Sequence, residues 1–233
     1  MITPCEVIML AAEGRAEATA RTLAALSGDC GARKTLHWVG ESAPPPHDGW
    51  DLAYWPGKPR GQLVDFWHAL EMTVRESPDA DIVCLEDDIL GCKNALAKTV
   101  AWYSPYLTTF VNTRHFRPGL RLVDDKGFWP LCCIKIPAPV AARLVATDPT
   151  SRTWHPETTK PAWLRQKNDR PQSIHEGDMV IGRMLRAWGL KYYQYQSIFQ
   201  HIGAVSLCNP QATLDGYRVA HDFPGVDFDA MTL

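Results

Sequence analysis

The chain has 233 residues, 45% of them hydrophobic, and a formal net charge of −2 at pH 7. This length suits one large α/β domain with a substantial core, and the composition argues against an intrinsically disordered chain. The near-neutral charge argues against a globally basic surface for a nucleic-acid polymer, although it leaves a local basic patch open.

The sequence also bears on membrane and redox environment. Its apolar stretches are shorter than a membrane span, and residues 1–6 lack the basic segment of a signal peptide. The seven cysteines form neither a CxxC pair nor a Cys/His zinc spacing, and Cys84, Cys132 and Cys133 fall in apolar runs. We therefore expect reduced core cysteines in a cytoplasmic protein without a membrane span.

The chain opens with the pattern of a βα unit. Residues 6–10 predict a strand, and a short glycine-containing loop leads into a helix. Arg15 in this loop is a candidate contact for a diphosphate, because a guanidinium pairs well with phosphate oxygens. Residues 35–39 predict a second strand, and residues 51–55 predict either a third strand or an aromatic loop wall.

Residues 61–74 have helical periodicity with an apolar stripe. Gly61 opens this helix and Arg60 stands just before it, so the helix N-terminus is a candidate anion site. Asp65 and His68 lie within one turn of each other. They suit either a nucleotide contact or an ordinary polar helix face, and we retain Asp65 as a candidate contact.

The most distinctive stretch is Asp81–Ile89. Its apolar run, residues 82–85, predicts a buried parallel strand that ends in three consecutive carboxylates, Glu86, Asp87 and Asp88. Open α/β sheets bind ligands at this end of their strands. Neighbouring acids repel one another and are costly to bury, and a bound cation is the usual way to make such a cluster favourable. The alternative is a solvated acidic turn.

The second half of the chain predicts shorter elements. The expected helices are residues 93–106, 137–145 and 179–189, and the expected strands are 108–113, 127–136 and 191–195, with a hairpin or loop at 119–126. Residues 148–173 form the longest irregular segment and mix Trp, His, Arg and Lys with proline. We interpret this segment as a lid or an acceptor-facing loop, with an exposed insertion as the alternative.

Several motifs resemble a known enzyme class. The order of elements is similar to the GT-A fold of nucleotide-sugar glycosyltransferases, and Glu86-Asp87-Asp88 fits the acidic DXD-type motif that closes a central strand there. Asp178-Met179-Val180-Ile181-Gly182 resembles the second part of the E-D-x-x-Φ-G pattern, with Glu176 two places before Asp178. Residues 85–89 and 197–203 are both similar to motifs of the N-acetylglucosaminyltransferase IV family.

This resemblance implies a fold and a set of domain limits. It implies a single GT-A-like, Rossmann-like domain with a mixed, mostly parallel central sheet flanked by helices. Residues 1–107 would form the nucleotide-binding half, residues 108–207 the acceptor half, and residues 208–233 a C-terminal tail.

The resemblance also implies roles for individual residues. Asp88 and His201 would bind Mn²⁺ or Mg²⁺, because carboxylates with one imidazole suit these cations. The remaining candidates for contact with the nucleotide sugar come from the residue patterns described above and from the resemblance. They are Arg15, Gly61, Asp65, Glu86 and Asp87. Asp178 would be the catalytic base of an inverting displacement, with Glu176 in reserve.

The expected function is therefore metal-dependent transfer of a sugar from a nucleotide-diphosphate sugar, UDP-sugar first, to an acceptor hydroxyl. A glycan, a small molecule, a protein or a modified nucleobase in nucleic acid are all open as acceptors. A metal-dependent phosphoesterase and a non-catalytic nucleotide-sugar-binding protein are the alternatives. A phosphoesterase would ordinarily need two close metals and therefore more acids and histidines.

Overall fold

The computed structural model describes residues 3–112, 121–123, 132–147, 177–202, 220 and 222–233. Its strands, in chain order, are β1 (Cys5–Ala12), β2 (Arg33–Gly40), β3 (Asp51–Pro56), β4 (Asp81–Glu86), β5 (Ile89–Gly91), β6 (Leu107–Thr109), β7 (Arg121–Val123), β8 (Cys133–Ile136), β9 (Tyr192–Gln194) and β10 (Phe199–His201). Its helices are α1 (Ala16–Ala25), α2 (Gln62–Glu76), α3 (Ala95–Ala101), α4 (Ala138–Thr147), α5 (Gly177–Ala187) and the 3₁₀ helix η3 (Ala230–Thr232).

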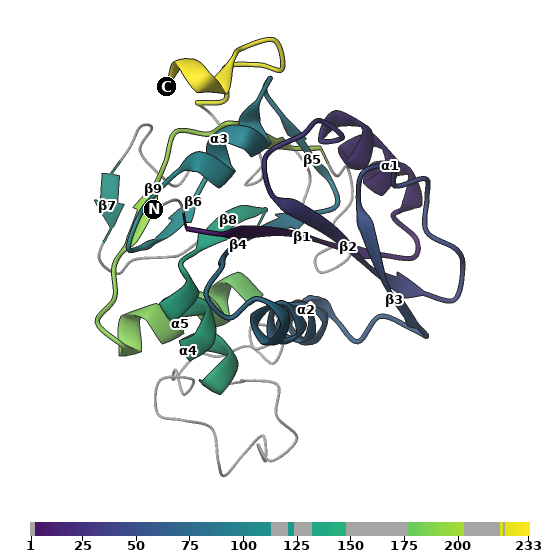
Figure 1. Cartoon of the computed structure of the whole chain (residues 1–233), viewed down its shortest axis with the longest axis horizontal. Helices are drawn as coiled ribbons and strands as arrows, with labels where there is room; N and C mark the ends of the chain where they lie inside the picture. The colour runs from purple at the N-terminus through teal and green to yellow at the C-terminus, as the bar shows by residue number, and fades with distance from the viewer. Residues whose placement is uncertain (1–2, 113–120, 124–131, 148–176, 203–219, 221) are drawn as a thin grey trace.

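Eight of these strands form one mixed, mostly parallel sheet in the order β3-β2-β1-β4-β8-β6-β9-β7 (Figure 1). The first four strands of that order are parallel to one another. β8 runs antiparallel to both β4 and β6, whereas β6 and β9 are parallel. The α/β, Rossmann-like expectation is confirmed at this level, and the division into two halves and a tail stays a prediction.

Helices cover both faces of the sheet, and β4 shows why. Successive side chains of a strand point to opposite faces. Ile82 and Cys84 belong to one apolar core, with α2, α4 and α5, whereas Val83 and Leu85 belong to the other, with α1 and α3. Figure 1 shows the two sets of helices on opposite sides of the sheet. A strand covered on both faces is apolar throughout, which is the pattern that predicted it.

Three sequence predictions need correction in detail, and a fourth is described only in part. The helix expected over 93–106 ends at Ala101, because Trp102 is extended and the ammonium of Lys135 binds the carbonyls of Val100 and Trp102 at 2.7 and 2.6 Å. The strand expected over 108–113 is the shorter β6. Within the segment expected as a hairpin or loop, β7 pairs with the distant β9. Of the strand expected over 127–136, residues 127–131 lie outside the described residues, and β8 is the part that the structure confirms.

The last part of the chain packs on α3. The backbone N–H of Ala230 donates to the carbonyl of Lys93, and the N–H of Lys93 donates to the carbonyl of Val226, both at 2.9 Å. The segment expected as a lid, residues 148–173, lies outside the described residues. None of the helices that can be described has the length and apolar character needed to cross a membrane.

Candidate functional site

The acidic turn lies where the large sheet meets the small one. Glu86 is the last residue of β4, and Asp87 and Asp88 connect it to β5. β5 pairs antiparallel with β10 in a separate two-stranded sheet, which places His201 opposite Ile89. The backbone N–H of Ile202 also donates to the carbonyl of Asp88 at 2.7 Å. This pairing brings together Asp88 and His201, which the motifs had predicted to share one site.

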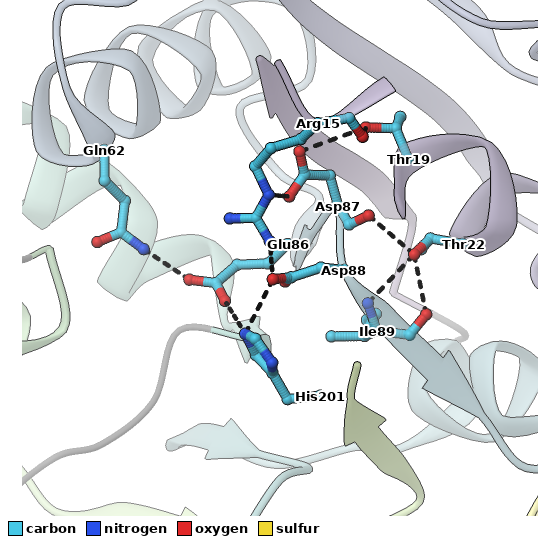
Figure 2. Close-up of polar contacts among 9 residues, drawn as sticks. All are labelled: Arg15, Thr19, Thr22, Gln62, Glu86, Asp87, Asp88, Ile89 and His201. Carbon is cyan, nitrogen blue, oxygen red and sulfur yellow. Dashed lines mark hydrogen bonds and ion pairs between the residues drawn. The ribbon is translucent and has the colours of Figure 1, made fainter. Parts of the chain in front are cut away.

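The side chains of this turn converge, as Figure 2 shows. Nε2 of His201 lies 3.0 Å from Oδ2 of Asp88 and 3.9 Å from Oε2 of Glu86. Nε of Arg15, which ends the loop after β1, lies 3.1 Å from Oδ1 of Asp87, and the same guanidinium pairs with Asp88. Arg15 therefore contacts two of the three predicted acids directly.

Two threonines of α1 support the turn from the other side. The hydroxyl of Thr22 lies 2.9 Å from the carbonyls of both Asp87 and Ile89, and it accepts the N–H of Ile89 at 3.1 Å. The hydroxyl of Thr19 donates to Oδ2 of Asp87 at 3.3 Å. Sequence reasoning missed this support. Its only signal was a pair of threonines three residues apart, on the helix face that the structure buries.

The turn holds more negative charge than its contacts neutralise. Asp87 is 4% exposed and Asp88 is fully buried. Burial raises the pKa of Asp87 to about 6, against the opposing effect of Arg15. Oδ1 of Asp88 accepts no hydrogen bond from any residue that the structure describes. When all three acids are ionised, the single guanidinium of Arg15 leaves two negative charges, which is the deficit that a divalent cation removes.

A cavity of about 230 Å³ opens beside this turn. The five residues predicted to contact the nucleotide sugar all line it: Arg15, Gly61, Asp65, Glu86 and Asp87. Apolar side chains of β1, β2 and α2 complete the wall: Leu10, Val39 and Phe66. The lining thus combines apolar and charged side chains, at the carboxyl ends of parallel strands where open α/β sheets bind ligands.

The start of α2 forms one side of the cavity. Gly61 precedes the helix with φ of +109°, a conformation that favours glycine, and its carbonyl accepts the N–H of Asp65 at 3.0 Å. The two carboxylate oxygens of Asp65 accept the backbone N–H and Nε of Arg60 at 3.0 and 2.9 Å. Asp65 is therefore a buried, paired acid rather than part of a solvated helix face. The Gln62 amide, which sequence reasoning overlooked, donates to Oε1 of Glu86 at 2.6 Å.

A cysteine joins the same cluster. Cys132 directly precedes β8, and its carbonyl accepts the backbone N–H of Glu86 at 3.0 Å. One ligand atom from each of Glu86, Cys132 and His201 lies within 4.8 Å of the other two. Sequence reasoning had placed Cys132 in the core, and it is indeed buried. Nothing in its apolar surroundings along the chain signalled that it would lie beside an acid and a histidine.

The predicted catalytic base is only partly placed. Asp178 is the second residue of α5, so the expected helix start near this acid is confirmed, but its side chain lies outside what the structure describes. Glu176 also lies outside the described residues.

No protein-family model matches this sequence, and no curated protein matches it either. Function therefore has to be inferred from the site itself.

Proposed function

We propose that this protein is a metal-dependent glycosyltransferase, which moves a sugar from a nucleotide-diphosphate sugar to an acceptor hydroxyl. The observation that carries the proposal is the convergence of Asp88, Glu86 and His201 beside a cavity that the five candidate donor-contact residues line. A UDP-sugar is the first donor to test. The finer fold assignment, GT-A, is part of the same proposal, because the acidic motif ends a central strand as that fold requires.

The residues of the turn fit a divalent cation. Asp88 has a buried carboxylate oxygen without a hydrogen-bond partner among the described residues, and buried polar oxygens ordinarily have one. His201 adds a nearby imidazole, and carboxylates with imidazole suit Mn²⁺, with Mg²⁺ as the harder alternative. When bound here, the cation supplies positive charge to the diphosphate that leaves as the glycosidic bond breaks.

The chain's own groups position the donor. The apolar wall of the cavity would accommodate a nucleobase, and the carboxylates that line it would accept hydrogen bonds from ribose hydroxyls or from ordered water. Arg15 lines the same cavity while it pairs with Asp87, so its guanidinium is within the site that would hold the diphosphate. Gln62 holds Glu86 by its amide, so that this acid has one oxygen restrained and the other directed toward His201.

Asp178 is the proposed base for the acceptor. The acceptor hydroxyl must lose a proton as its oxygen attacks the anomeric carbon, and a carboxylate within hydrogen-bond reach can take it. Attack from the face opposite the leaving diphosphate inverts the anomeric centre. Asp178→Asn is therefore expected to lose transfer while retaining donor binding. Glu176→Gln is the comparison that tests whether Glu176 acts as the base instead.

The first experiment measures the thermal stability of the full chain with UDP and Mn²⁺, alone and together. We expect the pair to raise the melting temperature more than either component, and Asp88→Asn to lose that gain. A panel of nucleotide sugars then identifies the donor through its slow hydrolysis. Hydrolysis of a generic phosphodiester without nucleotide binding would instead support a phosphoesterase. UDP binding by the unaltered chain, with neither hydrolysis nor transfer for any donor and acceptor, would support a binding protein.

A further inference from the structure

The cysteine beside the acidic turn bears on which cation this site takes. Cys132 reaches the site through the antiparallel pairing of β8 with β4, in which Cys133 lies opposite Leu85 and the next pair is Cys132 and Glu86. His201 arrives through the separate pairing of β10 with β5. Three segments that are far apart in the sequence thus place a carboxylate, a thiol and an imidazole within 4.8 Å of one another.

These separations suit a single cation. Bonds of about 2.0–2.3 Å to oxygen, nitrogen and sulfur place the ligand atoms of a tetrahedral site about 3.3–3.8 Å apart. Nε2 of His201 and Oε2 of Glu86 are already 3.9 Å apart, and no pair within the group exceeds 4.8 Å. Closure around a cation therefore requires side-chain movements of about 1 Å or less.

The three residues differ in burial, which shows which side of the cluster faces the cavity. Cys132 and His201 are 6% and 2% exposed, whereas the Glu86 side chain is 20% exposed and lines the cavity. The first two groups thus form the closed, inner side of the cluster. The remaining side faces the cavity, where an oxygen of a bound ligand could complete the coordination.

The thiol decides which cations suit this ligand set. Thiolate sulfur and imidazole nitrogen favour borderline transition metals, whereas Mg²⁺ prefers oxygen ligands and keeps its water. For mixed ligand sets of this kind, affinity rises from Mn²⁺ through Fe²⁺ to Co²⁺, and Zn²⁺ also binds more tightly than Mn²⁺. In such a site a coordinating cysteine is held as its thiolate by the cation.

We propose that Cys132 coordinates the cation together with Glu86 and His201, and that the site selects cations of the Co²⁺ and Zn²⁺ class over Mg²⁺. The inference rests on the proposed function in that it concerns the same cation site, and it changes the ligand set and the metal expected there. Asp88, with Oδ2 3.0 Å from Nε2 of His201, remains beside this cation as a further carboxylate.

The test is a Co²⁺ titration of the chelator-treated full chain, followed by absorption spectroscopy and without any nucleotide. A coordinated thiolate produces a charge-transfer band in the near ultraviolet, and the visible bands of Co²⁺ report a low coordination number. We expect both signals. Zn²⁺ should displace Co²⁺, whereas a large excess of Mg²⁺ should not, because Mg²⁺ binds thiolate and imidazole poorly.

Variants separate the ligand from other cysteines. Cys132→Ser is expected to lose the charge-transfer band and to weaken Co²⁺ binding by more than about tenfold, which is the effect of disturbing even an outer-shell partner. Cys132→Asp, which restores an oxygen ligand, is expected to bind Mn²⁺ without that band. The control is Cys30→Ser, because Cys30 precedes β2, which lies three strands away from β8 in the sheet, and this variant should retain the band.

The outcomes separate this inference from the proposed function. Three results would overturn the role of Cys132. They are Co²⁺ binding without a thiolate band, no Co²⁺ binding at all, and equal Co²⁺ affinity in the unaltered chain and in the folded Cys132→Ser and Cys132→Asp variants. Donor hydrolysis with Mn²⁺ could still stand in those cases. Conversely, a cysteine-dependent band in a chain that binds no nucleotide sugar would support the metal site and refute the transferase.

Discussion

Replacing Arg15 by methionine tests the charge balance of the acidic turn. Arg15 contacts Asp87 at 3.1 Å and also pairs with Asp88, and both acids are almost completely buried. Removing one partner of a buried ion pair costs about 3–5 kcal/mol, because the remaining charge is left without compensation. We expect Arg15→Met to lower the free energy of unfolding by that amount at pH 8. The loss should be smaller at pH 5, because the raised pKa of Asp87, about 6, leaves this acid largely protonated there.

The assay is urea unfolding of the full chain at both pH values, with and without a divalent cation. Arg33→Met is the matched control. Arg33 also pairs with two acids, Glu6 at 2.9 Å and Glu76 at 2.7 Å, but its side chain is 45% exposed. Such surface pairs contribute about 0–1 kcal/mol. Divalent cation should stabilise all three chains through the proposed site, and Arg15→Met the most, because there it also replaces the missing charge. An Arg15→Met loss no greater than that of Arg33→Met would refute the reasoning.

Three further predictions concern buried polar groups outside the cation site. Burial lowers the pKa of His37 to about 4, so the unfolded chain takes up its proton first as the pH falls from 6.5. The free energy of unfolding should therefore drop by about 3 kcal/mol between pH 6.5 and 4, and His37→Leu should lose this component in urea titrations. Lys135→Met should cost about 3–5 kcal/mol in the same assay, because the ammonium lies 3.5 Å from buried Asp81; a loss under 1 kcal/mol would contradict this. Thr22→Val should lower the free energy of unfolding by about 1–3 kcal/mol and weaken Co²⁺ binding, because the Thr22 hydroxyl holds the backbone of the acidic turn. An unchanged free energy of unfolding would show that the turn does not need this support.

The first half of the chain was predictable in part because its elements are locally determined. The apolar run of β4 and the amphipathic stripe of α2 follow from residues near in sequence, and the structure has both. The end of α3 was not predictable in this way. It depends on Lys135, which reaches two carbonyls of the helix end from a strand more than thirty residues later. The antiparallel position of β8 between β4 and β6 likewise depends on long-range pairing.

The site residues differ in the same way: some had a local sequence signal, and others depend on long-range contacts. The three acids were visible because they interrupt an apolar run, and the His201 assignment came only through the motif resemblance. Cys132 and Thr22 had no such signal. A buried cysteine and a buried helical threonine are ordinary core residues until the neighbouring chain is known. Their proximity to Glu86 and Asp87 arises from the register of β8 on β4 and from the packing of α1 against the turn.

The position of Arg15 limits what the acidic turn can bind. A turn with three ionised acids and no fixed cation would carry three negative charges, and a divalent ion alone would leave one of them buried. Arg15 removes one of these charges permanently, since guanidinium stays protonated at any physiological pH. The three acids and Arg15 by themselves then leave two negative charges, to which a Cys132 thiolate or a bound phosphate group would add more. The acidic turn therefore needs at least one divalent cation for its charges to balance, and the cation site proposed above would supply it.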